Sequence, residues 1–206
     1  DDGRFVVFAS AATNLTDAET GGGATDVYRY DRSDGSLVNV TAGGTGSGSS
    51  ANPDVSNAGS VVFESGKSFA TADTDGFGDV YSWDGNQTYS IVSQTAAKGQ
   101  VAVASGEPSV SRTGRWVAFR GYSDSLVPGD TNGYSDVFVK DLATDRIELV
   151  SRPAAGEANQ SSSRPAISAN GLSVAFESAA TNLADVDGNG TGADVFLVGN
   201  PLVQTT

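Results

Sequence analysis

The 206-residue sequence contains no histidine, no cysteine and no methionine. Histidine is the commonest general base, and the cysteine thiol is a strong nucleophile and a soft metal ligand. Carboxylates, hydroxyls, tyrosine, lysine and arginine are therefore the only side chains left for chemistry. Without cysteine there are no disulfides, which suits an extracytoplasmic bacterial protein as well as an intracellular one. Without methionine, the sequence is expected to be a processed or excised piece.

Positive charge is also scarce, with 12 basic against 25 acidic residues and a formal net charge of -13. Nucleic acids and anionic membranes attract clustered lysine and arginine, so neither is expected as a partner. No apolar run is long enough for a signal peptide or a membrane span, and no membrane insertion is expected. Cations and basic protein surfaces are the partners that this charge favours.

An internal repeat organises the chain. An aspartate precedes a valine and an aromatic residue four times, at Asp26, Asp79, Asp136 and Asp194. A second landmark, in which two small apolar residues precede a phenylalanine, recurs at intervals of about 55 to 57 residues, a period typical of propellers, solenoids or arrays; it ends at Phe8, Phe63, Phe119 and Phe176. A third, starting at Pro53, Pro108 and Pro165, has no counterpart before Phe8. The chain thus begins partway through its first repeat.

Each repeat contains short runs of β-branched and aromatic residues separated by glycine-containing turns, which predicts four short strands. In the third repeat these are Pro108–Ser111, Trp116–Phe119, Asp136–Val139 and Ile147–Ser151. A solenoid coil is usually shorter than this period, and sandwich domains need roughly 100 residues each. We therefore predict an all-β fold with almost no helix: a β-propeller of four four-stranded blades, the first lacking its innermost strand. Residues 1–206 form a single array, with repeats at about 1–51, 52–106, 107–163 and 164–206.

The connection between the second and third strand of each repeat carries oxygen ligands at alternate positions. Calcium takes six to eight oxygens, and carboxylates spaced in this way around a glycine turn can converge on one ion. The repeated aspartate would close each loop from the first residue of the third strand. The predicted ligands of structural Ca²⁺, up to one ion per blade, are Asp17, Glu19, Asp26, Asp73, Asp75, Asp79, Asp130, Asn132, Asp136, Asp185, Asp187, Asn189 and Asp194.

The four loops do not carry this pattern equally well. The loop from Asp185 to Asp194 resembles the opening of an EF-hand loop, although no helices flank it. The first loop, with Glu19 and three glycines, fits least well. The alternative is that aspartate, asparagine and glycine simply form turns here, with side chains capping backbone amides and no metal bound.

Together these motifs resemble the TolB-like, WD-repeat-like β-propeller family of secreted and periplasmic bacterial proteins. The segments Pro108–Phe119, Asp136–Thr144 and Val150–Ser151 carry the resemblance best, and it extends over essentially the whole chain. It implies a propeller and a secreted, periplasmic or cell-surface location, and it is not specific for function. The acidic loops are similar to the calcium loops of integrin-type propellers. In a propeller blade whose four strands run antiparallel in chain order, the long connections that hold these loops emerge on one face of the propeller.

Three functional hypotheses follow. The leading one is a noncatalytic, calcium-stabilised propeller that binds a protein or a cell-surface polymer through its long-loop face. The alternative is a carboxylate-dependent glycosidase or polysaccharide lyase that uses Glu64 and Glu177, although these residues also fit as solvated strand ends or as support for the ion loops. The third is assembly: a homo-oligomer or a partner chain would complete the first blade. Leu202-Val203 is expected to complete the last blade as a short strand.

Overall fold

The computed structural model of the chain describes residues 3–17, 23–100, 102–122, 124–185, 187–190 and 192–203. These residues form fourteen β-strands and no helix, as the β-branched and aromatic runs between glycine turns predicted. Among the described residues there is accordingly no helix with the length and apolarity needed to span a membrane. The expectation of an all-β fold is confirmed.

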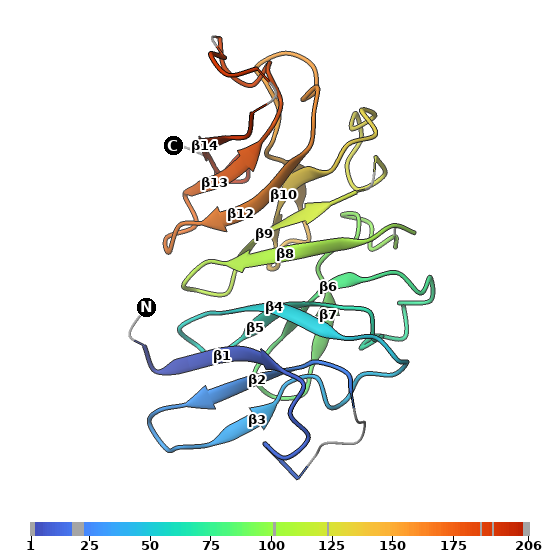
Figure 1. Cartoon of the computed structure of the whole chain (residues 1–206), viewed down its shortest axis with the longest axis vertical. Helices are drawn as coiled ribbons and strands as arrows, with labels where there is room; N and C mark the ends of the chain where they lie inside the picture. Colours follow the sequence, from blue (N-terminus) through green and yellow to red (C-terminus); the bar gives the residue numbers. More distant parts are fainter. Residues whose placement is uncertain are drawn as a thin grey trace.

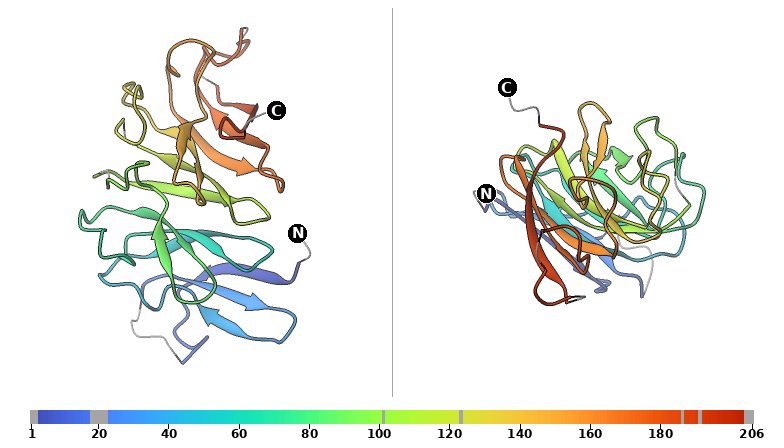
Figure 2. Two further views of the ribbon diagram at one scale, coloured as in Figure 1. Left: turned by 180° about the vertical axis from the view of Figure 1, so that it is seen from behind. Right: turned by 90° about the horizontal axis from the view of Figure 1, so that it is seen from above.

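Four antiparallel sheets follow one another along the chain and stack in sequence order, from the first sheet at the bottom of Figure 1 to the fourth at the top. Figure 2 shows the same order from behind. The strands are β1 (Phe5–Ser10), β2 (Asp26–Asp31) and β3 (Leu37–Asn39) in the first sheet; β4 (Ser50–Val55), β5 (Val61–Ser65), β6 (Asp79–Trp83) and β7 (Tyr89–Ile91) in the second; β8 (Ser105–Val110), β9 (Trp116–Gly121), β10 (Asp136–Asp141) and β11 (Ile147–Leu149) in the third; and β12 (Ser162–Ile167), β13 (Ser173–Ser178) and β14 (Asp194–Gly199) in the fourth.

The two repeated aromatic landmarks face each other across every sheet. In the third sheet Phe119 on β9 is directly opposite Phe138 on β10, and their rings stack with centroids 5.8 Å apart. The equivalent pairs stack at 5.4 Å in the first sheet, 5.8 Å in the second and 5.6 Å in the fourth. Offset stacking adds to the burial of these rings, so the two landmarks keep the same spacing because they form one contact.

The hydrophobic core lies between neighbouring sheets. Three clusters of buried residues fill the spaces between the first and second, second and third, and third and fourth sheets. The valine that follows the repeated aspartate is fully buried in each of these clusters, at Val27, Val80 and Val137. Each sheet is therefore stabilised by its neighbours, as in other repeat architectures.

The first and fourth sheets have three strands each, whereas the middle sheets have four. The first sheet begins with the second strand of the repeat, β1, which agrees with the predicted lack of an innermost strand. The fourth sheet differs from the prediction, because residues 201–203 form a turn and a bend where a short strand was expected. The Asn200 side chain explains this turn. Its amide nitrogen donates to the Gly171 carbonyl over 2.8 Å, and its oxygen accepts from the Leu202 backbone amide. Leu202 is buried against the core.

Each innermost strand contains a β-bulge that the sequence did not reveal. The register shifts before the proline landmark in β4, β8 and β12. There Asn52, Glu107 and Arg164 adopt left-handed φ angles of 48°, 54° and 50°, which are unusual for residues with a side chain. Next to the bulges, Asp54 accepts from the Val110 amide of the next sheet over 2.8 Å. The bulges thus accompany hydrogen bonds between neighbouring innermost strands.

Candidate metal centre

The repeated aspartate is the first residue of β2, β6, β10 and β14, as predicted. In the first three sheets a hydroxyl two residues after the last strand of the sheet donates to one carboxylate oxygen of this aspartate. The pairs are Thr41 to Asp26 over 2.9 Å, Ser93 to Asp79 over 2.5 Å, and Ser151 to Asp136 over 2.6 Å. The same hydroxyl accepts from the amide of the valine that follows the aspartate. In Asp79 and Asp136 the other oxygen accepts from an amide, that of Gln100 over 3.5 Å and that of Asn132 over 2.8 Å.

We call the connections before these aspartates the first loop (11–25), second loop (66–78), third loop (122–135) and fourth loop (179–193). In the second loop Asp73 and Asp75 approach Asp79, and one oxygen from each lies within 4.8 Å of the others. Within the described part of the chain this is the one group of three carboxylates that meets this criterion. One Asp75 oxygen is buried without a hydrogen bond. The spacing of two and four residues around Gly76 thus brings these three carboxylates together.

The carboxylates of the second loop repel one another. Burial raises the pKa of Asp79 to about 6, and the negative charges of Asp73 and Asp75 add to this effect against the Ser93 hydrogen bond. The Tyr81 hydroxyl donates to Asp73, and burial together with this bond raises the pKa of the tyrosine. A bound cation would relieve this repulsion, because an opposite charge favours the ionised carboxylates.

In the third loop Asp130 is the central residue. Its side chain is only 1% exposed, and neither carboxylate oxygen has a hydrogen-bond partner. Burial raises the pKa of Asp130 to about 7, and the negative charges of Asp136, Asp124 and Glu157 raise it further, whereas the nearby backbone amide of Asn132 acts in the opposite direction. An unpaired buried carboxylate is costly, so both of its oxygens are available to a cation that enters this site.

Other side chains shape the third loop. Asn132 donates to Asp136 over 2.8 Å and to the Ala158 carbonyl over 3.2 Å, and its oxygen accepts from the Tyr134 amide. Its amide nitrogen is thus turned toward Asp136 in this structure. Burial also raises the pKa of Asp136, in spite of the hydrogen bonds it accepts from Ser151 and Asn132.

Each of these two loops is contacted by a residue of the next long connection, which the loop patterns did not reveal. Gln100 accepts from the Thr74 amide over 3.1 Å and donates to Asp73 over 2.9 Å. Glu157 accepts from the amide of Thr131 and, over 2.9 Å, from its hydroxyl. Both lie 26 residues after the threonine that they contact, and this shared spacing could have revealed them. These contacts bring the two kinds of long connection together beside the second and third loops.

The aspartate that follows the first loop, Asp26, is paired with a cationic side chain. The Lys67 ammonium lies 2.5 Å from Asp26, with the two side chains only 13% and 14% exposed. Asp17 is exposed, and Glu19 lies outside the described residues. The repeated aspartate that follows the first loop is therefore neutralised by a lysine of the second loop.

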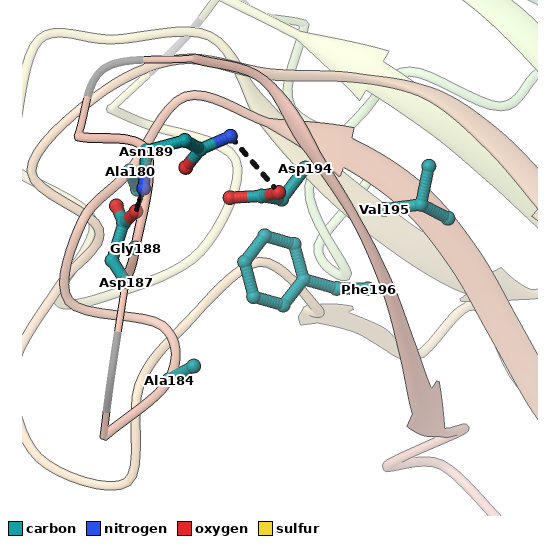
Figure 3. Close-up of a pocket in the computed structure, with 8 residues that line it drawn as sticks. All are labelled: Ala180, Ala184, Asp187, Gly188, Asn189, Asp194, Val195 and Phe196. Atoms are coloured by element: carbon teal, nitrogen blue, oxygen red, sulfur yellow. Dashed lines mark hydrogen bonds between the residues drawn. The ribbon is translucent and has the colours of Figure 1, made fainter.

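In the fourth loop the predicted ligand Asn189 is exposed, and Asp187 and Asp194 are half-buried; Figure 3 shows how these three side chains lie. Asp187 accepts from the backbone amides of Asn189 and Gly190, over 3.0 and 2.9 Å. The Asn189 side chain extends toward Asp194 and donates to it over 3.3 Å, and Phe196 lies beside this contact in the same pocket. Asp185 is exposed. The sequence pointed to this loop most strongly, yet the buried carboxylates lie in the second and third loops.

The two glutamates considered as catalytic acid and base have protein partners. Glu64 accepts from the Glu107 amide over 2.8 Å, and Glu177 forms a 2.7 Å ion pair with Arg164. They belong to the second and fourth sheets, with the third sheet between them. Neither contact pairs one glutamate with the other.

The sequence matches no family model and no curated protein. The structure is similar to TolB from Acinetobacter baumannii (TM-score 0.55, 15% identity, 97% of this chain and 39% of that one) and to a putative TolB from Agrobacterium tumefaciens (TM-score 0.55, 17% identity, 97% and 64%). The fold is a TolB-like β-propeller. This propeller chain spans less than two thirds of both TolB chains.

The same propeller fold occurs in proteins of different function. An oligogalacturonate lyase in complex with manganese has a TM-score of 0.50 with this chain, at 12% identity over 97% of this chain and 46% of the lyase. At such identities the likeness concerns the fold alone, and function has to be argued from the residues of this propeller.

Proposed function

We propose that the chain is a noncatalytic, calcium-stabilised β-propeller that acts outside the cytoplasm and binds a protein or a cell-surface polymer through its long-loop face. The observation that carries the proposal is Asp130, a buried carboxylate with no hydrogen bond to either oxygen. Such a carboxylate is neutralised either by a proton, as its raised pKa reflects, or by a positive charge beside it. In the proposal, a bound cation supplies that positive charge.

The chemistry of the donors favours calcium. The second loop offers three carboxylates, and the third offers Asp130 and Asp136 with Asp124 and Glu157 nearby. All are hard oxygen ligands, and the chain has no thiolate or imidazole. Calcium also tolerates irregular loops better than magnesium does, since magnesium requires near-ideal octahedral geometry. We place one ion in the second loop and one in the third; ions in the first and fourth loops have less support.

The ion would act on the face that binds the partner. In the third loop Glu157, which belongs to the connection between β11 and β12, already contacts Thr131 of the loop itself. Gln100 makes the equivalent bridge in the second loop. A cation that fixes either loop therefore also fixes the long connection beside it, and loops on a rigid scaffold are where binding residues usually lie. Millimolar extracellular calcium suits a module of this kind.

The charge of the chain indicates the partner's chemistry. With a net charge of -13, the surface attracts cationic partners, such as a basic protein surface or a polymer carrying amino groups. The enzymatic alternative has less support, because Glu64 and Glu177 are each engaged by the protein and lie two sheets apart.

The test is a binding and turnover screen of the purified chain against proteins of both charges and a polysaccharide panel, with Ca²⁺ or with EDTA. The proposal expects binding that weakens in EDTA, and no turnover. A long-loop variant, Glu157→Gln, should weaken binding while the matched variant Glu148→Gln on β11 does not. Turnover that disappears in Glu64→Gln or Glu177→Gln would establish the enzymatic alternative instead.

A further inference from the structure

Two exposed aromatic side chains occupy equivalent positions in the second and third loops. Phe77 and Tyr134 each lie two residues before the repeated aspartate and directly after a glycine. Phe77 is 46% exposed and Tyr134 is 37% exposed. Single exposed apolar residues are common on protein surfaces, but an aromatic ring at the same place in two loops is not random scatter. The repeat therefore presents these rings to solvent as a feature of the loops.

The same turn holds both rings. The glycine before each ring has a left-handed φ angle, 76° in the second loop and 72° in the third. The Phe77 backbone amide donates to the Asp75 carboxylate over 2.9 Å. The Tyr134 backbone amide donates in the same way to the Asn132 side-chain oxygen over 2.8 Å. Bonds of this kind fix a turn, and Asp75 and Asn132 are also predicted calcium ligands. One turn therefore holds both the ring and the candidate ion site.

No neighbouring ring or cation covers these two side chains. Among the described residues, neither Phe77 nor Tyr134 stacks on another ring or lies beneath a guanidinium or ammonium group. Tyr122, the other exposed aromatic residue of the third loop, differs because the Arg120 guanidinium lies 4.8 Å from its ring centre. The rings of Phe77 and Tyr134 are thus available to a ligand.

The two loops lie on one side of the molecule. In Figure 1 the second and third loops both extend from the right-hand side of the stacked sheets, and in the left view of Figure 2, seen from behind, both extend from the left. They precede β6 and β10, the equivalent strands of two sheets that pack on each other. A chain-like ligand that crosses this side of the molecule can therefore reach both loops.

The surroundings of the rings indicate the chemistry of the ligand. Among the described residues of the second loop, Phe77 is the one large apolar side chain that is exposed, so the ring is not part of the contiguous apolar core of a protein interface. A sugar ring fits such a site, because its C–H face packs on an aromatic face and its hydroxyls donate to carboxylates. The net charge of -13 repels anionic polymers and favours protonated amines, which aromatic faces also attract.

We infer that Phe77 and Tyr134 form the contact surface for a polysaccharide that carries amino groups, with its sugar rings stacked on the two aromatic rings. The inference rests on the proposed function, because it names the ligand class and the contact residues of the long-loop face. It also gives calcium a role in binding. The ion fixes Asp75 and Asn132, and these two residues fix the turns that present the rings.

The test is isothermal titration of the 206-residue chain with glucosamine oligosaccharides in Ca²⁺-containing buffer, with N-acetylglucosamine oligosaccharides of equal length as the neutral comparison. The wild type is expected to bind the glucosamine oligosaccharides more tightly. Phe77→Ala and Tyr134→Ala should each weaken this binding about tenfold, and the double variant should lose it. Tyr30→Ala, which removes a ring of 37% exposure from β2 in the first sheet, is the matched control and should leave binding unchanged.

Calcium binding is measured on the same samples, so that the inference and the proposed function fail separately. A wild type that binds no calcium overturns the proposed function. Sugar binding that persists in the double alanine variant overturns the inference alone, as does equal affinity for the two oligosaccharides or no binding of either by the calcium-loaded chain. Phe77→Leu and Tyr134→Leu keep an apolar side chain at each turn. They should retain calcium and still bind the sugar about tenfold more weakly, which separates loss of the ring from loss of the loop.

Discussion

Lys67 of the second loop and Asp26 at the start of β2 form a nearly buried ion pair, with 2.5 Å between the ammonium and the carboxylate. The equivalent aspartates Asp79 and Asp136 have no ion pair among the described residues, and both have a raised pKa caused mainly by burial. Lys67 supplies the positive charge beside Asp26. We propose that calcium supplies it beside Asp79 and Asp136.

Replacing Lys67 with methionine should destabilise the protein strongly. Removing one partner of a buried pair leaves an uncompensated charge and costs about 3–5 kcal/mol, and the residual exposure places this pair at the lower end. Chemical denaturation measures the loss. The double variant Lys67→Met with Asp26→Asn should recover most of it, because no unpaired charge remains. A double variant that is less stable than Lys67→Met would show that Asp26 has another role.

Asp130→Asn should change the stability of the protein in opposite directions with and without calcium. In EDTA at pH 8 the variant should be more stable than the wild type by about 1–3 kcal/mol, because a buried unpaired charge is gone. In Ca²⁺ the order should reverse, since the wild type alone gains binding energy at the third loop. Thermal melting measures both. Asp145→Asn, at a surface ion pair with Lys98, is the control and should change little in either condition.

The stability of the metal-free protein should fall as the pH rises from about 4 to about 7. Asp79 and Asp130 have pKa values of about 6 and about 7 in the folded protein, above their ordinary value of 3.8. The folded state therefore keeps protons that the unfolded chain releases, and this contribution is lost as the pH passes each folded pKa. Melting in EDTA across this range should show the decline, and Asp79→Asn with Asp130→Asn should flatten it. A rise with pH in the wild type would contradict these shifts.

Gly171→Ala should destabilise the fourth sheet. Gly171 has a φ of 74°, and a Cβ there would lie 2.2 Å from the Trp116 ring of the third sheet. Left-handed strain and overpacking together cost about 1–3 kcal/mol. Gly188→Ala, at a position with nothing within 4 Å of the added atom, is the matched control and should cost less than about 0.5 kcal/mol. Equal melting temperatures for the two variants would contradict the packing.

The repeat made most of the fold predictable. Phe119 and Phe138 stack because their landmarks are in step, and the aspartates begin the third strands because an apolar run starts immediately after each one. The bulges at Asn52, Glu107 and Arg164 were not predictable, since left-handed φ angles are rare outside glycine. The turn at Asn200 was also missed, because a short apolar pair after proline fits a strand equally well until its side-chain contacts are known.

The candidate site was predictable only in its local part. Asp73, Asp75 and Asp79 lie within seven residues of sequence, so their spacing alone indicated convergence. Glu157 comes from a different connection, and its contact with Thr131 depends on how neighbouring sheets place their loops. The charge of Lys67 beside Asp26 likewise crosses between sheets. Single-loop patterns cannot reveal such contacts, which is why the fourth loop looked the most promising in sequence.

The most direct test of the central claim is the number of calcium ions bound per chain, measured by isothermal titration of the chelator-stripped protein at pH 8. The account predicts two ions for the wild type, bound at the second and third loops, and one ion for each of the variants Asp79→Asn and Asp130→Asn. No binding by the wild type, or a stoichiometry that neither substitution changes, would contradict it.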